Sequence, residues 1–194
     1  MEFRRLALFG LIGFVATGAV IEALPDDLIT IAVREPSASN QPIAASYHEG
    51  ACTKAGVTLV VDFGIASDKE PIIRCATDFA GTGWDLFAAT DIKVAGTLQY
   101  PTGFVCRIEN WPIEEDCRNT PTVAAGTWVY FLPSKSSATE WSMSGTGASM
   151  HRPGCGSSEG WLFISGDEAG ELNDGYRYQA SGPSVLPVSL SCSE

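Results

Sequence analysis

Six cysteines that follow an apolar amino-terminal segment constrain this chain more than any other feature of its sequence. An even number of cysteines in an exported chain indicates disulfides, because compartments outside the cytoplasm are oxidising. Three such bonds would brace one fold, although six cysteines can pair in fifteen ways. The cysteines are Cys52, Cys75, Cys106, Cys117, Cys155 and Cys192.

The amino-terminal segment has the layout of a secretory signal. Arg4 and Arg5 supply the positive start, and an uncharged apolar run follows over residues 6–21. The run is long for a signal and short for a membrane span, so an uncleaved anchor is the alternative. Either way we expect a secreted or extracytoplasmic cell-envelope protein. The expected organisation is a signal peptide or membrane anchor at 1–24, a spacer at 25–50, a folded domain at 51–166 and an irregular tail at 167–194 packed on that domain.

Charge and composition exclude one class of partner and favour one class of fold. The formal net charge is -11, and no Lys/Arg cluster follows Arg5. Such a surface repels phosphate backbones, so we expect no nucleic-acid binding. Scarce Lys and Arg, frequent Gly and well-represented aromatic residues favour a β-rich extracellular domain.

Alternating apolar residues predict a strand at 57–63, and a second strand is expected at 72–76. Cys52 precedes the first strand and Cys75 closes the second, so a hairpin would bring both to the same open end. The geometry of the hairpin therefore favours a Cys52–Cys75 bond.

The remaining cysteines are expected to form two further pairs. Cys106 lies in a predicted strand and Cys117 in the loop after it, so a bond between them would tie that loop back to its strand. Cys155 and Cys192 are left, and their bond would pin the tail. No metal site or other cofactor is expected. No C-x-x-C motif occurs, and the one histidine near Cys155 is His151.

One helix is predicted, over residues 82–91. Thr82 and Asp85 have the spacing of a capping box, with Asp where Glu or Gln is usual. Three residues at helical spacing form its expected apolar face: Trp84, Phe87 and Ala88.

The remaining pattern completes an α+β fold. Further strands are expected at 94–100, 103–109, 127–132, 141–143 and 161–164. The strand at 127–132 is apolar on both faces and is therefore expected near the centre of the sheet. A strand hairpin, one short helix, a second hairpin and closing strands predict a β-grasp-like mixed sheet, with additional strands and a disulfide-pinned tail.

The chain resembles a group of small exported actinobacterial proteins related to the carboxy-terminal domain of transcobalamin and intrinsic factor. The resemblance covers about residues 52–164 and implies a soluble-ligand-binding β-grasp domain, often associated with uptake of cobalamin, cobalt or related nutrients. The chain departs from the pattern at 127–131, where relatives carry a strand denser in aromatics. The resemblance is carried by residues 57–64, 74–76, 83–86, 103–108, Cys117 with 120–121, and 159–163.

Aromatic residues supply the candidate binding site. Trp84, Trp128 and Trp161 are expected in the core, where most buried aromatics lie. Trp111 differs because it sits in a loop beside a proline and inside the expected Cys106–Cys117 bridge, where a held ring can stack on a ligand or anchor a partner. Its replacement by alanine is expected to weaken binding and to leave the melting point nearly unchanged. The candidate ligand- or partner-binding residues are Trp111, Trp141, Tyr100 and Tyr130.

No catalytic residue is expected. Residues 156–160 match the nucleophile motif G-x-S-x-G, with Ser158 at its centre. That chemistry needs a histidine after the serine, whereas His48 and His151 both precede it. A flexible Gly/Ser loop is the preferred interpretation of these residues. The acidic residues around 167–175 lack the spacing of a calcium loop and are interpreted as solvated.

The sequence therefore predicts an exported binding protein that is not an enzyme. The first hypothesis is capture of a small soluble ligand, corrinoid-like or a related nutrient, for an envelope transport system. The alternative is an accessory or structural subunit that docks on an envelope membrane protein complex. A secreted hydrolase is a third hypothesis, which a carboxylate or serine in reach of a histidine would favour.

Overall fold

The computed structural model describes residues 46–168 and 181–192, so the expected leader and most of the expected spacer lie outside the described residues. A six-stranded sheet has the order β1-β3-β2-β8-β6-β7, and β4 and β5 form a separate two-stranded sheet. The elements are β1 (Ser46–Glu49), β2 (Val57–Asp62), β3 (Ile72–Thr77), α1 (Asp85–Ala89), β4 (Val94–Gly96), β5 (Val105–Ile108), the 3-10 helix η1 (Val123–Ala125), β6 (Thr127–Pro133), β7 (Trp141–Met143) and β8 (Ser158–Ile164).

The large sheet is mixed, which agrees with the α+β class expected from the sequence. β2 pairs antiparallel with β3 on one side and parallel with β8 on the other. All six residues of β2 are buried, and β8 is buried along nearly its whole length. Strands that are covered on both faces belong in the middle of a sheet, because only there do apolar residues on both faces leave water.

The two faces of the sheet carry two separate apolar clusters. On one face α1 and β5 cover the larger cluster, which includes Leu59, Phe87 and Trp161. On the other face a smaller cluster surrounds Val60 and Phe131, with Val185 of the tail packed against it. The side chains that alternate along β2 and β6 therefore serve opposite faces, as the period of two requires.

The predicted helix is present but shorter than the sequence suggested. The backbone N–H and the hydroxyl of Thr82 both donate to Asp85 Oδ2 at 2.8 Å, so the expected capping contact forms just before α1 begins. The hydroxyl of Thr90 donates to the Leu86 carbonyl at 2.8 Å and marks the other end. The buried face of α1 is Leu86 and Phe87, and the expected apolar position Ala88 is exposed.

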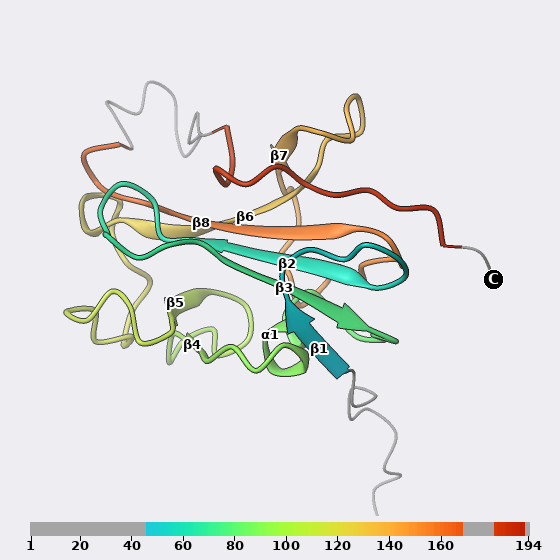
Figure 1. Ribbon diagram of the computed structural model, residues 1–194. Helices are drawn as coiled ribbons and strands as arrows, with labels where there is room; N and C mark the ends of the chain where they lie inside the picture. The colour runs from blue at the N-terminus through green and yellow to red at the C-terminus, as the bar shows by residue number, and fades with distance from the viewer. Residues whose placement is uncertain (1–45, 169–180, 193–194) are drawn as a thin grey trace, which may run out of the picture. The chain divides into compact units, whose positions relative to one another are not determined.

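Residues 181–192, which we call the tail strap, cross the face of the sheet opposite α1 (Figure 1). Asp62, at the end of β2, accepts hydrogen bonds from the backbone N–H and hydroxyl of Ser184 at 2.7 and 2.5 Å. Ser158 exchanges two hydrogen bonds with the backbone of Val188. The strap is thus bonded to the ends of both central strands.

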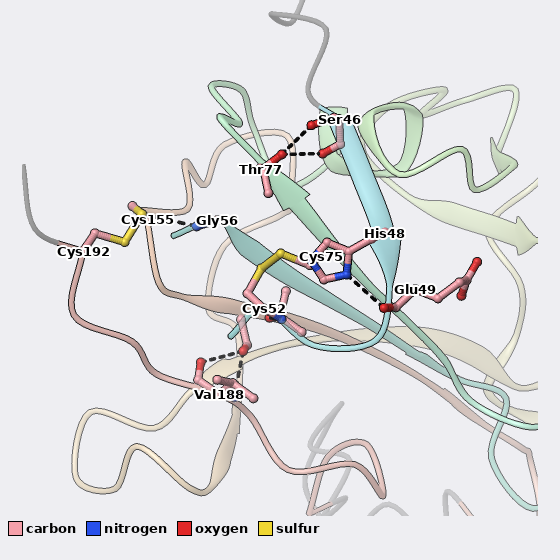
Figure 2. Close-up of a disulfide and its surroundings, with 12 residues drawn as sticks. Ser46, His48, Glu49, Cys52, Gly56, Cys75, Thr77, Cys155, Val188 and Cys192 are labelled. Carbon is pink, nitrogen blue, oxygen red and sulfur yellow. Dashed lines mark hydrogen bonds between the residues drawn. A yellow bond between two sulfur atoms is a disulfide. The ribbon is translucent and has the colours of Figure 1, made fainter. Parts of the chain in front are cut away.

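The structure contains disulfides between the three pairs expected from the sequence. Cys52–Cys75 joins the start of the β2–β3 hairpin, and Cys155–Cys192 attaches the tail strap beside it (Figure 2). The Gly56 backbone N–H donates to Cys155 Sγ at 3.4 Å and so lies between the two bonds. The third bond, Cys106–Cys117, ties the loop after β5 back to that strand.

Two expectations from the sequence are wrong. β1 falls inside the range 25–50 expected as a spacer and pairs antiparallel with β3. Residues 158–160, expected in a flexible loop, are the first half of β8 and are buried. The small residues there serve close packing, because a Cβ added to Gly160 would lie 2.9 Å from the Trp141 ring and 3.1 Å from Pro183.

Gly160→Val should lower the free energy of unfolding by roughly 1–3 kcal/mol, because the added methyl groups overpack the space under Trp141. Gly154→Val is the matched control, since a Cβ at Gly154 meets no heavy atom within 4 Å. Urea denaturation measures both. Equal stability of the two variants would contradict the placement of Gly160 inside a packed strand.

Candidate ligand-binding groove

An open groove with a volume of about 710 Å³ lies on the α1 face of the sheet, over one end of β6. Loops that are distant in sequence form its walls around that strand. A groove of this size falls in the range of roughly 300–1,000 Å³ that accommodates small organic ligands. It is lined by residues 103–105, 120–122, 127–130 and 143–148, together with Trp161.

Three aromatic rings from two paired strands form the floor. Trp128 and Tyr130 are two residues apart on β6 and therefore share a face. Trp161 lies directly opposite Tyr130 on β8, and the two rings stack with centroids 4.9 Å apart. All three side chains are more than nine-tenths buried, so the floor is a rigid part of the core rather than a set of free side chains.

The groove is lined without formal charge. Among the described residues that line it there is no Lys, Arg, His, Asp or Glu side chain. The apolar side chains of the walls are Phe104, Pro121 and Met143. Residues 144–147 add backbone and hydroxyl groups to the lining. Because a buried charge needs a partner, this lining suits a neutral molecule with a flat apolar surface.

A carboxyl group lies beneath the floor. Glu159 has 0% exposed surface and projects from β8 on the same face as Trp161. The Tyr130 hydroxyl donates a hydrogen bond to Glu159 Oε2, and His151 Nε2 lies 3.3 Å from Oε1. The groove floor and this carboxyl therefore share the hydroxyl of Tyr130.

Burial sets the protonation of this cluster. Removal from water raises the pKa of Glu159 to about 9 and lowers the pKa of His151, since both charged forms lose hydration. The 3.3 Å contact has the geometry of an ion pair, but burial opposes charge on either partner. Burial therefore favours a protonated Glu159 beside a neutral His151, and we assign this state at neutral pH.

The segment before α1 closes the space around the carboxyl. The Gly83 N–H donates to the His151 carbonyl at 2.9 Å, which holds the histidine segment against this turn. A Cβ at Gly83 would lie 2.7 Å from both Glu159 Oε2 and the Tyr130 hydroxyl oxygen. The hydrogen bond between Tyr130 and Glu159 thus forms because a residue without a side chain leaves room for it.

The structure does not bring the four candidate residues from the sequence together. Tyr130 lies in the groove floor. Trp111 is half-buried and not a free loop ring, because its ring packs against core residue Phe163 with centroids 4.3 Å apart. Trp141 is 8% exposed and lies under the tail strap, where its indole N–H donates to the Val185 carbonyl. Tyr100 is 49% exposed in a turn and does not line the groove.

Sequence reasoning missed Glu159 and His151. Glu159, Trp161 and Phe163 alternate along β8, and this period would have placed the glutamate on the core face. The flanking serines and glycines concealed the pattern. His151 has no sequence signal, because its contact with Glu159 depends on the fold.

The contact between Glu159 and His151 meets the condition that would favour the hydrolase hypothesis, a carboxyl group in reach of a histidine. In the part of the chain that the structure describes, the hydroxyl group in contact with Glu159 and His151 is that of Tyr130, which donates a hydrogen bond to Glu159. Ser158, the serine of the G-x-S-x-G motif, is 0% exposed and bonded to the backbone of Val188. The arrangement therefore does not present an exposed nucleophile beside the histidine.

The chain was compared with family models, curated proteins and solved structures. No family model, curated protein or solved structure matches the chain. Within residues 46–168 and 181–192, no three His, Cys, Asp or Glu side chains are grouped as a metal site would require. No helix in the same part of the chain has the length and apolar character needed to cross a membrane.

Glu159→Gln should flatten the pH dependence of stability between about pH 6.5 and 9. Folded Glu159 keeps its proton up to about pH 9, whereas an unfolded glutamate loses it near pH 4.5. The unfolded state therefore binds fewer protons, and wild-type stability falls as pH rises, by up to about 1.4 kcal/mol per pH unit. Glutamine has no such proton to lose.

Urea denaturation of both proteins at several pH values measures this difference. Below about pH 6.5 the lowered pKa of His151 contributes with the opposite sign, because the unfolded histidine binds a proton first. The comparison is therefore made above that pH. Parallel stability profiles for wild type and Glu159→Gln would contradict a protonated acid at this site.

Trp111→Ala should lower the free energy of unfolding by roughly 2–4 kcal/mol, since it removes a half-buried ring that packs against three core aromatic residues. Tyr100→Ala should change it by less than about 0.5 kcal/mol, because that ring is half exposed. This expectation replaces the unchanged melting point that the sequence suggested for Trp111→Ala. Thermal denaturation of the two variants decides, and a stable Trp111→Ala protein would restore the loop interpretation.

Proposed function

We propose that this protein is an exported, non-catalytic binding protein whose groove captures a small neutral molecule with a flat apolar surface. The observation that carries the proposal is the groove of about 710 Å³, with an aromatic floor and no formal charge in its lining. Phe104, Pro121 and Met143 would supply most of the apolar contact area above the largely buried rings of Trp128 and Tyr130, and the polar groups at 144–147 would orient the ligand. The formal net charge of -11 disfavours anions as ligands.

Disulfides support this function by holding the walls in place. The three bonds indicate an oxidising compartment. Cys106–Cys117 joins the segment after Phe104 to the segment before Thr120, and both of these residues line the groove. A groove whose walls are fixed before binding loses less conformational entropy when a ligand enters.

The strand order supports a β-grasp assignment for the domain. The features that support it are the β2–β3 hairpin, α1 on one face, and a last strand, β8, that pairs parallel with β2. With the resemblance to transcobalamin-like proteins, it makes a corrinoid-like nutrient the specific candidate, delivered to an envelope transport system. A large macrocycle would extend beyond the groove, which is open to solvent.

Exposed apolar residues favour one second candidate, docking on an envelope membrane protein complex. Leu98 and Ile113 are 78% and 73% exposed, and Tyr100 is 49% exposed. These residues lie in loops joined by the Cys106–Cys117 bond and by a hydrogen bond from the Leu98 N–H to the Cys117 carbonyl. Contiguous exposed apolar residues are typical of protein contact sites, and the docking candidate depends on these three side chains forming one patch.

Gly147→Phe should block the groove and weaken ligand binding at least tenfold. Gly147 lines the groove, and a Cβ there would meet only the Gly103 carbonyl oxygen, at 3.9 Å, which belongs to another lining residue. The variant can therefore fold, with its ring placed in the groove. Gly154→Phe is the matched control, because Gly154 has open space around it and does not line the groove.

Binding is measured by fluorescence titration with the neutral dye Nile red and by calorimetry with cyanocobalamin. Binding of either probe to wild type and Gly154→Phe, with loss in Gly147→Phe, supports capture in the groove. Cyanocobalamin binding that Gly147→Phe removes would support the corrinoid assignment in particular. If neither probe binds, or if Gly147→Phe binds as well as wild type, the proposed function is wrong.

A further inference from the structure

Glu159 is linked to the groove without lining it. Its carboxyl accepts the hydroxyl of Tyr130, and Tyr130 stacks on Trp161 at a centroid distance of 4.9 Å. Both rings form the floor of the groove. A change at the carboxyl therefore reaches the groove through one hydrogen bond and one stacked ring.

We infer that Glu159 is a positioning residue for ligand binding: its protonated carboxyl fixes the Tyr130 ring against Trp161, and loss of the proton loosens the floor and weakens binding. The inference rests on the proposed function for the binding step. Its structural step, the coupling of a buried proton to the aromatic floor, can be tested without a ligand.

The space around the carboxyl explains why ionisation would disturb the floor. Oε2 faces the Tyr130 hydroxyl, Oε1 faces His151 Nε2, and the backbone of Gly83 closes the third side. Among the described residues Oε1 has no hydrogen-bond partner, so an ionised Glu159 would place charge on an unstabilised atom unless His151 turns to present a proton on Nε2. Ionisation would therefore draw in water or turn the His151 ring, and either change moves the side chains around the carboxyl.

The charged groups on neighbouring elements are engaged elsewhere. Arg74 of β3 shares the face of Glu159 across Leu59 of β2, but it pairs with Glu49 at 3.2 Å and donates to carbonyls at the end of α1. Asp85 of α1 accepts from Thr82. Tyr130 is the titratable group that β6 contributes. His151 thus remains as the group that can exchange a proton with Glu159.

His151 also supplies the route between the buried proton and solvent. Its side chain is 32% exposed, whereas that of Glu159 is fully buried. Arg152, which follows it, is exposed to solvent. Protons can therefore reach Glu159 through one partly exposed ring, so the cluster can follow the pH of the surrounding medium without unfolding.

The test compares wild type, Glu159→Gln and Tyr130→Phe between pH 7 and 10. Nile red is the probe, because it stays neutral and any pH dependence then comes from the protein. Wild-type affinity should fall at least fivefold with a midpoint near pH 9, and Glu159→Gln should keep its affinity over the same range. Tyr130→Phe, which lacks the hydroxyl, should bind more weakly at pH 7 and lack the transition near pH 9.

A second readout needs no ligand. The intrinsic tryptophan fluorescence of wild type should change near pH 9, with no matching change in Glu159→Gln. Glu159→Gln retains every tyrosine, so tyrosine ionisation appears in both proteins and cancels in the comparison. If Glu159→Gln does not fold, carbon-13 NMR of the glutamate carboxyls in wild type replaces it, and one resonance should titrate near pH 9.

The outcomes separate this inference from the proposed function. The same fall of Nile red affinity in wild type and Glu159→Gln overturns the inference and leaves groove binding intact. If neither Nile red nor cyanocobalamin binds at any pH, the proposed function is wrong. The tryptophan fluorescence and the carbon-13 NMR titration then test whether the proton on Glu159 is coupled to the aromatic floor. Titration of every glutamate near pH 4.5 overturns the inference whatever the dye does.

Discussion

The parallel pairing of β2 with β8 is the constraint on which the rest of the structure depends. It joins segments far apart in the chain, and it buries both strands on both faces. One face then receives α1 and the larger cluster, and the other receives the tail strap. Because β8 runs between β2 and β6, every side chain on it is committed to one of these two covered faces.

That commitment explains how an acidic residue comes to lie in the core. Glu159 occupies a position on β8 that faces α1, so its carboxyl is enclosed unless the strand shifts its register. The fold compensates with a hydrogen bond from the Tyr130 hydroxyl, with the nearby His151, and with a glycine, Gly83, that leaves room for the hydrogen bond. The polar cluster and the aromatic groove are therefore two sides of one arrangement, joined at Tyr130.

Much of the framework could be predicted from the sequence, because it depends on local patterns. The alternation at 57–63 predicted β2, the Thr82–Asp85 spacing predicted the start of the helix, and the hairpin geometry favoured the Cys52–Cys75 pair. The candidate site depended on contacts between distant residues and was less accessible. Trp111 and Trp141 are enclosed by Phe163 and by the tail strap, and no local pattern shows such cover. Gly and Ser at 156–160 suggested a loop, whereas the packing of Trp141 on Gly160 requires them in or beside a strand.

Two-dimensional NMR of the indole N–H signals during a titration with Nile red tests the central claim most directly. The chain has five tryptophans, of which Trp128 and Trp161 form the groove floor and Trp141 lies under the tail strap. Binding in the groove should shift the signals of Trp128 and Trp161 and leave that of Trp141 in place. Shifts confined to Trp141, or no shift in the two floor residues while the dye binds, would contradict the account.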